Sequence, residues 1–528
     1  MKNTVLILGV AIMIVCAPEV SAHPHGDEVP SYGGTLVWGV HTRPTIMNPL
    51  LTTHSVSMAL LDLIFNKLVR INTRGEIEPD LAERWEISAD GRNYTFYLRR
   101  GVQFHDGVEC TAEDVKFTFE KLRDIGLDSP FRHTYEKIED IELLDRYTVL
   151  IRLKQPSVAF IYRLVKEIVP RHILGNGDIR QHSFNRRPVG TGPFRFEAWT
   201  EDDRITLQYN PAYYEGRPYL DTIEVRTYPD LESLWTGLMR QEVDYAGFIS
   251  RENYEVAKKD PAFRTHTVPA DGYYVLFYNL TDTFKLNQLI REAIAYGINR
   301  EALIQKIAGG YGMVCHGPFH EELIKLPSGH RQSEYNPVKS KALIEKAGWE
   351  DTNNDGIFSK GGKELQLNLL VDKRDSVYMR MAMLIRQQLQ EIGVKLKVLD
   401  YADEKELHAY LDGYDPHIHL KMIPSYVDPD QIKDDWYAGG DSVWKNSLPE
   451  LDYLFEMGDS VFEESQRIQV YRDIQRVICS RHLVCFLYYP YAFHAVSSEL
   501  LNTDEFFTAS MPIYTIKNWC FNAKNERR

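Results

Sequence analysis

The chain has 528 residues, which is too long for one hydrophobic core, so two or three lobes are expected. Hydrophobic residues make up 44% of the chain and charged residues 26%, which is the composition of a soluble globular protein. The net charge of −14 at pH 7 argues against binding nucleic acid or an anionic membrane through the overall electrostatic field.

The first 22 residues have the pattern of a secretory signal peptide. Lys2 supplies the positive end, an apolar stretch runs from Val5 to Val15, and Val20-Ser-Ala22 supplies the small-residue cleavage site. The apolar stretch is too short to span a bilayer as a helix. A lipid anchor at Cys16 is not expected, because lipoprotein processing favours a small residue where this chain has valine. We therefore expect an exported, periplasmic protein.

Strands and helices alternate along the first half of the mature chain. Residues 94–98 alternate inward and outward as a half-buried strand does, and Thr111-Ala-Glu-Asp114 is a capping box that opens an amphipathic helix. The other elements expected here are strand 35–40, helix 57–69, strands 205–209 and 223–228, helix 231–240 and strand 243–248. The last three predict a right-handed crossover unit.

The second half continues the same alternation. Its expected elements are helices 289–298, 300–308, 340–347 and 378–392, strand 394–399, helix 465–479 and the apolar strand 483–489. No tandem repeat, low-complexity tract or long linker interrupts them. Together the two halves predict an α/β protein.

The segment from Glu78 to Leu122 carries a resemblance to a known family. Its sequence, EPDLAERWEISADGRNYTFYLRRGVQFHDGVECTAEDVKFTFEKL, resembles the characteristic segment of the family 5 extracellular solute-binding proteins. These are the receptors that feed dipeptide, oligopeptide and nickel ABC importers. Further segments similar to the family follow in its order at 188–194, 210–214, 277–280, 338–348 and 388–398. The resemblance therefore covers essentially the whole mature chain.

The resemblance implies a fold and a function. The fold would be a type II-like periplasmic binding protein, with two α/β lobes, an extra subdomain in lobe one and two hinge crossings. Mapped onto this chain, the signal peptide is 1–22, lobe one is 30–280 plus 491–528 with the extra subdomain at 72–200, and lobe two is 281–490. The hinges would cross near Asn279 and Pro490. The implied protein is a monomeric receptor without a cofactor, which delivers a small, peptide-like ligand to an ABC transporter permease.

Family geometry also implies which residues bind the ligand. They are Thr42, Arg43, Asn48, Gly317, Phe319, Arg374, Ser425, Tyr426, Asp428 and Trp436. Ser425 stands where peptide-binding relatives place an Asp that holds the free ammonium of the ligand, so an ordinary free-amine dipeptide is not the expected ligand. Arg374 either holds a ligand carboxylate or belongs to a solvated charge run.

Two other functions are weighed against the peptide receptor. His417 and His419 share one face of an expected strand, so a metal chelate of the nickel or haem type is an alternative ligand. The competing interpretation is that both histidines only form local hydrogen bonds. A secreted hydrolase is the other alternative, but the chain has no Gly-x-Ser-x-Gly, His-Glu-x-x-His or Walker motif. We therefore expect no enzymatic activity.

Three further patterns are expected to be structural. Residues 351–356 match half of a calcium loop, but position twelve is Gly362 instead of Glu, which favours a self-bonded turn. The glycine-rich stretch 189–193 lacks the Lys-Ser/Thr of a phosphate loop and predicts a tight turn. Five cysteines remain after the signal, an odd number that leaves at least one thiol unpaired: Cys110, Cys315, Cys479, Cys485 and Cys520.

Overall fold

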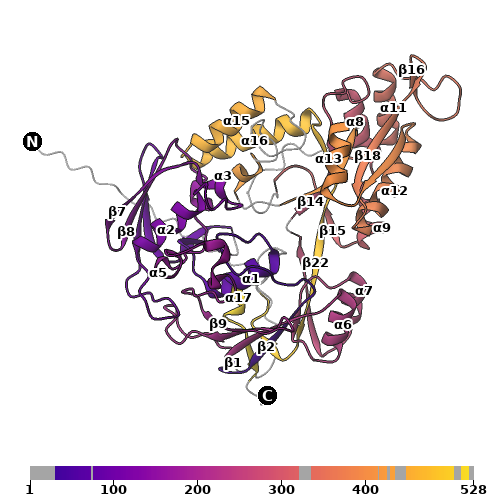
Figure 1. The fold of residues 1–528 in the computed structure, drawn as a ribbon. Helices are drawn as coiled ribbons and strands as arrows, with labels where there is room; N and C mark the ends of the chain where they lie inside the picture. The colour runs from indigo at the N-terminus through magenta and orange to yellow at the C-terminus, as the bar shows by residue number, and fades with distance from the viewer. Residues whose placement is uncertain are drawn as a thin grey trace, which may run out of the picture.

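The computed structural model describes residues 30–72, 75–270, 272–319, 334–413, 416–424, 428–433, 448–504 and 513–522. Within these residues the chain forms two α/β bodies, each with its own sheet and its own buried cores, joined by extended strands (Figure 1). We call the body at the bottom of Figure 1 lobe one and the body at its upper right lobe two. Expected and observed fold class agree.

Lobe one is built on a sheet with the strand order β13-β22-β12-β2-β11-β10-β9. Its strands are β2 Thr35–Val40, β9 Phe194–Trp199, β10 Ile205–Tyr209, β11 Thr222–Thr227, β12 Tyr245–Ala246, β13 Phe263–Pro269 and β22 Tyr488–Ser497. β11 and β12 both pair with β2 in parallel, and α6 Leu231–Met239 connects them. This is the crossover unit that the sequence predicts. Helices α1 Ser55–Ile64 and α7 Arg251–Ala257 also belong to this lobe. A small sheet joins β1 Pro30–Ser31, from the start of the described chain, to β24 Cys520–Asn522 and β23 Leu500–Leu501 near its end, where α17 Ile513–Ile516 also lies.

A subdomain is inserted into lobe one between α1 and β9. Its antiparallel sheet has the order β5-β6-β8-β7, beside the separate hairpin β3-β4. The strands are β3 Val69–Ile71, β4 Ile77–Pro79, β5 Ala82–Ile87, β6 Asn93–Leu98, β7 Ile138–Asp145 and β8 Thr148–Leu153. The helices are α2 Ala112–Leu122, α3 Arg132–Tyr135, α4 Phe160–Arg163 and α5 Arg171–Leu174, followed by the 3-10 turns Ile179–Gln181 and Ser183–Asn185. The capping box of α2 is present, because Asp114 accepts a hydrogen bond from the Thr111 amide at 2.9 Å.

Lobe two has a sheet of order β19-β18-β20-β14-β21 with helices on both faces. The strands are β14 Gly272–Tyr278, β18 Gln366–Asp372, β19 Lys395–Tyr401, β20 Ile418–Pro424 and β21 Val484–Phe486. One face packs on α8 Gln288–Gly297, α9 Arg300–Ala308, α11 Pro337–Lys346 and α12 Ser376–Glu391, and the other on α15 Pro449–Ser460 and α16 Glu464–Ser480. The short strands β15 Gly312–Val314, β16 Ser359–Lys360 and β17 Lys363–Glu364, the helix α13 Glu404–Gly413 and the 3-10 turn η3 Pro429–Ile432 complete it.

The chain passes between the two sheets at Ala270 and at Pro490. β13 pairs in lobe one and β14 pairs in lobe two, while β22 pairs with β15 up to Pro490 and with β13 from Tyr491 onward. The Ala270 amide donates to the Pro490 carbonyl at 2.8 Å, so the two crossings are bonded to each other. The first crossing differs from the one expected near Asn279, because all of β14 pairs with β20.

The apolar stretch 483–489, expected as one strand, is divided between the two sheets. β21 ends at Phe486 on the lobe-two sheet and β22 begins at Tyr488, with the Leu487 amide bonded to the Tyr274 carbonyl at 2.9 Å. The helix expected at 57–69 ends at Ile64. There Gly192 donates to the Ile64 carbonyl at 2.8 Å, and a Cβ on Gly190 would lie 2.1 Å from that oxygen. The glycine-rich stretch therefore serves close backbone packing.

Candidate ligand-binding site

The strand pairing fixes which end of the lobe-one sheet faces lobe two. β22 descends from lobe two and runs antiparallel to β12, so the carboxyl ends of β12 and of its parallel neighbour β2 point toward lobe two. Ligands of open α/β sheets bind at the carboxyl ends of the strands. A cavity of ≈ 60 Å³ lies at this edge, lined by Trp38, Gly39, Val40, His41, Thr42, Ser55, Val56, Tyr245, Gly247 and Phe248.

Aromatic rings around Tyr245 form the base of this cavity. Tyr245 is buried, its ring centroid lies 6.0 Å from that of Trp38, and Trp519 meets it edge-on at 5.3 Å. The Tyr245 hydroxyl lies 3.1 Å from Nδ1 of His494, and burial raises the pKa of Tyr245. Phe248 is 40% exposed beside His494 and provides apolar surface at the opening. The lobe-one half of the site therefore has aromatic walls, as binding cavities for organic solutes do.

The loop after β2 contributes two residues to the cavity, His41 and the predicted Thr42, while the predicted Arg43 and Asn48 contact other parts of the chain. Arg43 forms an ion pair with Asp203 at 2.7 Å, and its side chain is 65% exposed. Asn48 is fully buried, donates to Asn185 at 2.8 Å and accepts from the Leu50 amide at 2.9 Å. Asn48 therefore fixes the path of the loop.

In lobe two, two of the predicted residues lie beneath α16. Phe319 is 4% exposed and meets Tyr471 edge-on at 5.8 Å. Gly317 is buried against Gln475, and its carbonyl accepts from the Cys315 thiol at 3.2 Å. Burial raises the pKa of Cys315 to about 12, so the thiol stays protonated. Phe319 and Gly317 therefore pack the loop after β15 against α16.

Of the remaining predicted residues, Arg374 forms an ion pair on the surface, and three others lie outside the described residues. Arg374 forms a bidentate pair with Asp372, with Nε 2.9 and 3.0 Å from the two carboxylate oxygens, and is exposed. Its neighbour Lys373 pairs with Asp400 at 3.2 Å, as a surface charge cluster does. Ser425, Tyr426 and Trp436 lie outside the described residues.

Asp428 is held by an arginine that sequence reasoning does not single out. Arg467 on α16 donates to the two Asp428 oxygens at 2.7 and 2.9 Å, and Asp428 itself is 1% exposed. Asp428 also accepts from the Asp430 amide at 2.9 Å, which begins η3. Burial, together with Asp459 and Asp428, raises the pKa of Asp430 to about 6. Asp428 therefore positions its loop. The only sequence signal for its partner is the four-residue spacing of Arg467 and Tyr471, which places both side chains on one face of α16.

His417, directly before β20, and His419, on β20, bind separate partners. Nδ1 of His417 accepts from the Asn368 amide at 3.0 Å, and its Nε2 lies 3.3 Å from Lys285 and 3.4 Å from Asp282. Nε2 of His419 lies 3.3 Å from the Tyr401 hydroxyl. In the part of the chain that the structure describes, no group of three or more His, Cys, Asp or Glu is placed to hold a metal ion.

Residues 351–356 bond to one another. The Gly356 amide donates to Asp351 at 3.0 Å, and Asn353 donates to Asp355 at 2.8 Å. These are the contacts of a self-bonded turn.

Buried histidines are expected to make folding sensitive to acid. Burial lowers the pKa of His482 to about 4, whereas an unfolded histidine titrates near 6.5, so only the unfolded chain takes up this proton between those values. Stability should fall as the pH drops from 7 to 5, by about 2 kcal/mol for this residue. Asp62 and Asp430, with pKa values raised to about 6, act in the opposite direction. The measurement is chemical denaturation at both pH values, in which His482→Gln should lose about 2 kcal/mol less than wild type; an equal loss would contradict the assignment.

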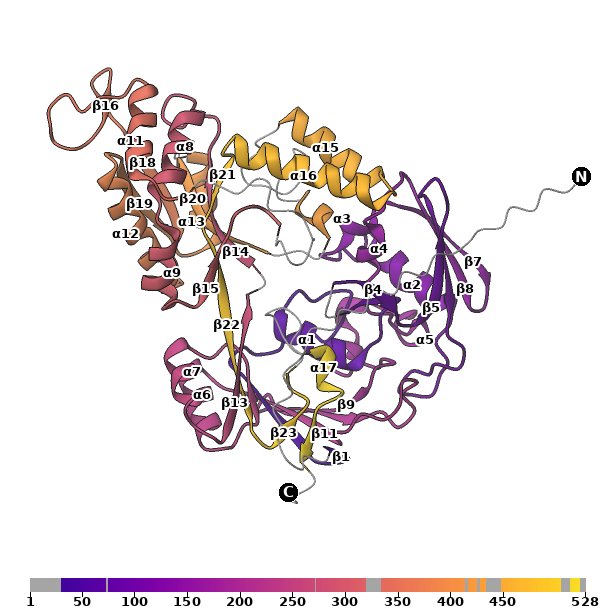
Figure 2. The same cartoon turned by 180° about the vertical axis from the view of Figure 1, so that it is seen from behind.

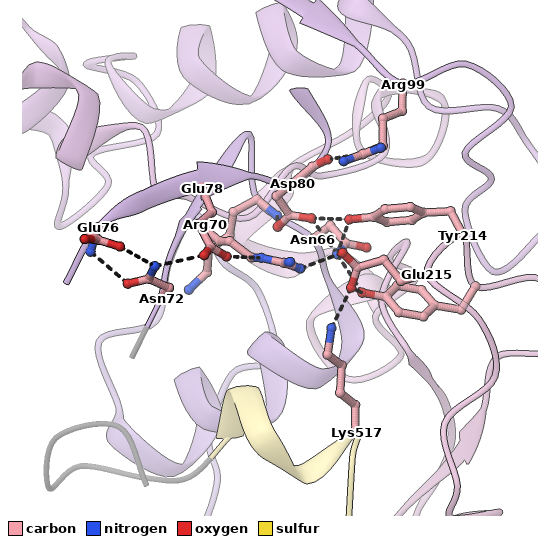
Figure 3. Close-up of polar contacts among 12 residues, drawn as sticks. Asn66, Arg70, Asn72, Glu76, Glu78, Asp80, Arg99, Tyr214, Glu215 and Lys517 are labelled. Atoms are coloured by element: carbon pink, nitrogen blue, oxygen red, sulfur yellow. Dashed lines mark hydrogen bonds and ion pairs between the residues drawn. The ribbon is translucent and has the colours of Figure 1, made fainter. Parts of the chain in front are cut away.

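The junction of subdomain and lobe one is held by a polar network around Asp80 (Figure 3). Asp80 is 3% exposed. Its Oδ1 accepts from Asn66 at 2.8 Å and from the Tyr214 hydroxyl at 2.5 Å, and its Oδ2 accepts from the Lys67 amide at 2.8 Å. Burial raises the pKa of Asp80 against the effect of these hydrogen bonds. Asp80 lies in the 78–122 segment and Tyr214 in the 210–214 segment, so two of the segments that carry the family resemblance contact each other.

The same network extends to the chain end. Arg70 donates to Glu215 at 2.7 Å, and Lys517, after α17, reaches the other oxygen of Glu215 at 2.5 Å (Figure 3). The network thus joins the subdomain hairpin, lobe one and the C-terminal helix. It fixes the scaffold that carries the candidate site.

Comparison with protein families decides what this scaffold is. The model of the bacterial extracellular solute-binding proteins, family 5, matches residues 76–444. The chain belongs to this family. The family is that of extracellular solute-binding proteins, and the fold described above matches solved structures of such proteins. Among the described residues, no helix is both long and apolar enough to cross a membrane.

Similar proteins cover nearly the whole chain. The oligopeptide-binding protein AppA of Bacillus subtilis (strain 168) is 28% identical over 93% of this chain and 92% of its own length, and the nickel-binding periplasmic protein of Escherichia coli (strain K12) is 25% identical over 88% and 89%. The structure of Bacillus subtilis AppA with a nonapeptide matches with a TM-score of 0.76, over 93% of this chain and all of that one. The structure of NikA from Brucella suis with Fe(III)-EDTA shares the fold, with a TM-score of 0.82. It is 20% identical in sequence, and the match covers 92% of this chain and all of that one.

Proposed function

We propose that this family 5 protein is the exported receptor of an ABC importer, which closes its two lobes around one peptide-like solute and passes it unchanged to a membrane permease. The observation that carries the proposal is the aromatic cavity at the carboxyl ends of β2 and β12, on the edge that faces lobe two. The two bonded crossings at Ala270 and Pro490 are suited to a hinge. The peptide-binding names of similar proteins support the same class of ligand.

The ligand would not be an ordinary dipeptide with a free amine. A buried ammonium needs a carboxylate partner, and this chain has Ser425 at the family position for it. Asp428 is already neutralised by Arg467, and Asp430 is 3% exposed with a raised pKa. Neither carboxylate is free to replace the missing one. A longer peptide, or one blocked at its amino end, fits these contacts better.

A metal chelate is the second candidate. His41 lines the lobe-one cavity, and burial lowers its pKa, so the imidazole is neutral at pH 7 and suited to bind a metal. Catalysis is not part of the proposal. Ser57 lies 3.5 Å from His54, but Ser57 is fully buried and serves α1, where its backbone amide donates to the His54 ring.

The ligand class is tested by a thermal-shift series. The purified protein is heated with a free-amine dipeptide, the same dipeptide acetylated at its amino end, a free-amine nonapeptide and nickel–histidine. A ligand at about 100 times its Kd stabilises the folded state by about 2.7 kcal/mol. We expect the acetylated or the longer peptide to raise Tm and the free dipeptide to have little effect. Stronger stabilisation by the free dipeptide would contradict the ligand class, and stabilisation by the nickel complex alone would favour the second candidate.

A further inference from the structure

The lobes of this protein meet a second time, far from the two crossings. Helices α15 and α16 extend from lobe two across to the subdomain of lobe one, and both views show this bridge above the space between the lobes (Figures 1 and 2). The bridge is centred on Asp459, the second-last residue of α15. Its carbonyl accepts from the Val158 amide at 2.8 Å, its Oδ1 from the Ser157 hydroxyl, and its Oδ2 from Lys137 at 3.3 Å.

The subdomain side of this contact is already organised by the subdomain itself. The Tyr94 hydroxyl donates to the Ser157 carbonyl, and the Ser157 amide to the Gly91 carbonyl at 3.4 Å. These bonds within lobe one hold the receiving surface in place, independent of α15. Phe462, in the turn between α15 and α16 of lobe two, adds an apolar contact across the junction, because its ring lies on Gly91, where an added Cβ would be 1.7 Å from the ring carbon Cζ.

The two sides belong to different cores. Tyr94 and Phe160 are buried in the core of lobe one and its subdomain, whereas Leu451 and Phe455 anchor α15 in the core of lobe two. The contact around Asp459 joins polar groups and the exposed ring of Phe462, and neither Asp459 nor Phe462 belongs to a core, so the contact can separate without opening either core. Asp459 is only 9% exposed in the bridge, whereas the Lys137 side chain is already 47% exposed, so separation would mainly return the Asp459 carboxylate to water.

We propose that Asp459 is a positioning residue for solute binding: its bridge to Ser157, Val158 and Lys137 holds the lobes closed on the side opposite the hinge and so sets how long a solute is retained. This rests on the proposed function, because it assumes that the lobes close on a solute. A hydrogen bond to a charged group contributes enough to change an equilibrium about tenfold or more. Most of the change should appear in the release rate, since the bridge does not touch the lobe-one cavity.

The test measures the distance between the lobes and the release rate in the same variants. All five cysteines that the structure describes are buried and free, so spin labels at Ile125→Cys in the subdomain and Val338→Cys in lobe two, both more than three-quarters exposed, can be attached selectively. Variants Asp459→Ala, Asp459→Asn and Ser157→Ala are compared with the control Asp473→Asn, whose half-buried carboxylate pairs with Arg476 within α16 at 3.0 Å.

We expect Asp459→Ala to add a population with a longer label distance and to release solute about tenfold faster, with Asp459→Asn and Ser157→Ala intermediate and the control unchanged. A merely structural role would lower Tm and leave both readouts as in wild type. Label distances that are the same in Asp459→Ala and wild type, with and without solute, would overturn the proposal. The label distance measured without solute distinguishes this proposal from the proposed receptor function. If no solute binds, the receptor function fails, whereas a longer label distance in Asp459→Ala than in wild type would still show that Asp459 holds the lobes together.

Discussion

Replacing Asp80 by alanine is expected to lower the free energy of unfolding by about 3 to 5 kcal/mol. The change removes the acceptor of three buried hydrogen bonds, from Asn66, Tyr214 and the Lys67 amide. Asn66 and the Lys67 amide are buried and Tyr214 is half-buried, and a buried donor that loses its acceptor costs about 1 to 3 kcal/mol. The subdomain junction should therefore loosen first. The midpoint of chemical denaturation measures the effect.

Glu86→Ala is the matched control. Glu86 is also a carboxylate of the subdomain that pairs with an arginine, Arg84 at 2.9 Å, but its side chain is 64% exposed. Exposed ion pairs contribute about 0 to 1 kcal/mol, so this variant should denature almost as wild type does. A loss for Asp80→Ala as small as that for Glu86→Ala would mean that the network does not hold the junction.

Replacing Arg467 by methionine is expected to cost a similar amount, about 3 to 5 kcal/mol, because it leaves Asp428 as an unpaired buried charge. Methionine keeps much of the apolar side-chain volume, so the loss reports the charge more than a cavity. Arg476→Met, on the same helix in an exposed pair with Asp473, controls for the change of residue type and should cost less than about 1 kcal/mol.

A second substitution identifies the cause of that loss. Asp428→Asn in the Arg467→Met background removes the unpaired charge while it keeps the side-chain shape. Stability should then recover in part, as expected when a buried pair is removed from both sides. A double variant less stable than Arg467→Met would show that Asp428 does not depend on the arginine.

Elements with local signals at both ends were predictable from the sequence. α9 has the expected bounds because Asn299 caps its start and Gly309, with φ of 62°, ends it. The strand at 483–489 was predicted as one element because its apolar composition is continuous. It divides at Leu487 because the two halves pair in different sheets, and no local pattern carries that information. The same cause moves the first crossing from Asn279 to Ala270.

The candidate site was less predictable than the fold. The family resemblance led to Thr42 at the cavity, but the pairing of Asp428 with Arg467 spans 39 residues of sequence and depends on how α16 packs. The pair of Arg374 with Asp372 is the opposite case, since two neighbouring opposite charges at a strand end could have been paired from the sequence. The bridge at Asp459 needed the relative placement of the lobes. Contacts between elements distant in sequence decide the positions of Asp428 and Asp459.

Native mass spectrometry of the purified mature protein, incubated with acetylated and free peptides, tests the central proposal most directly. We expect a one-to-one complex whose added mass equals the intact solute, and the solute released on unfolding should have the same mass as before binding. A receptor that captures and delivers gives that result at any incubation time. Cleaved or otherwise altered solute, formed by wild type and lost in a single-residue variant, would contradict the receptor function and favour a secreted hydrolase.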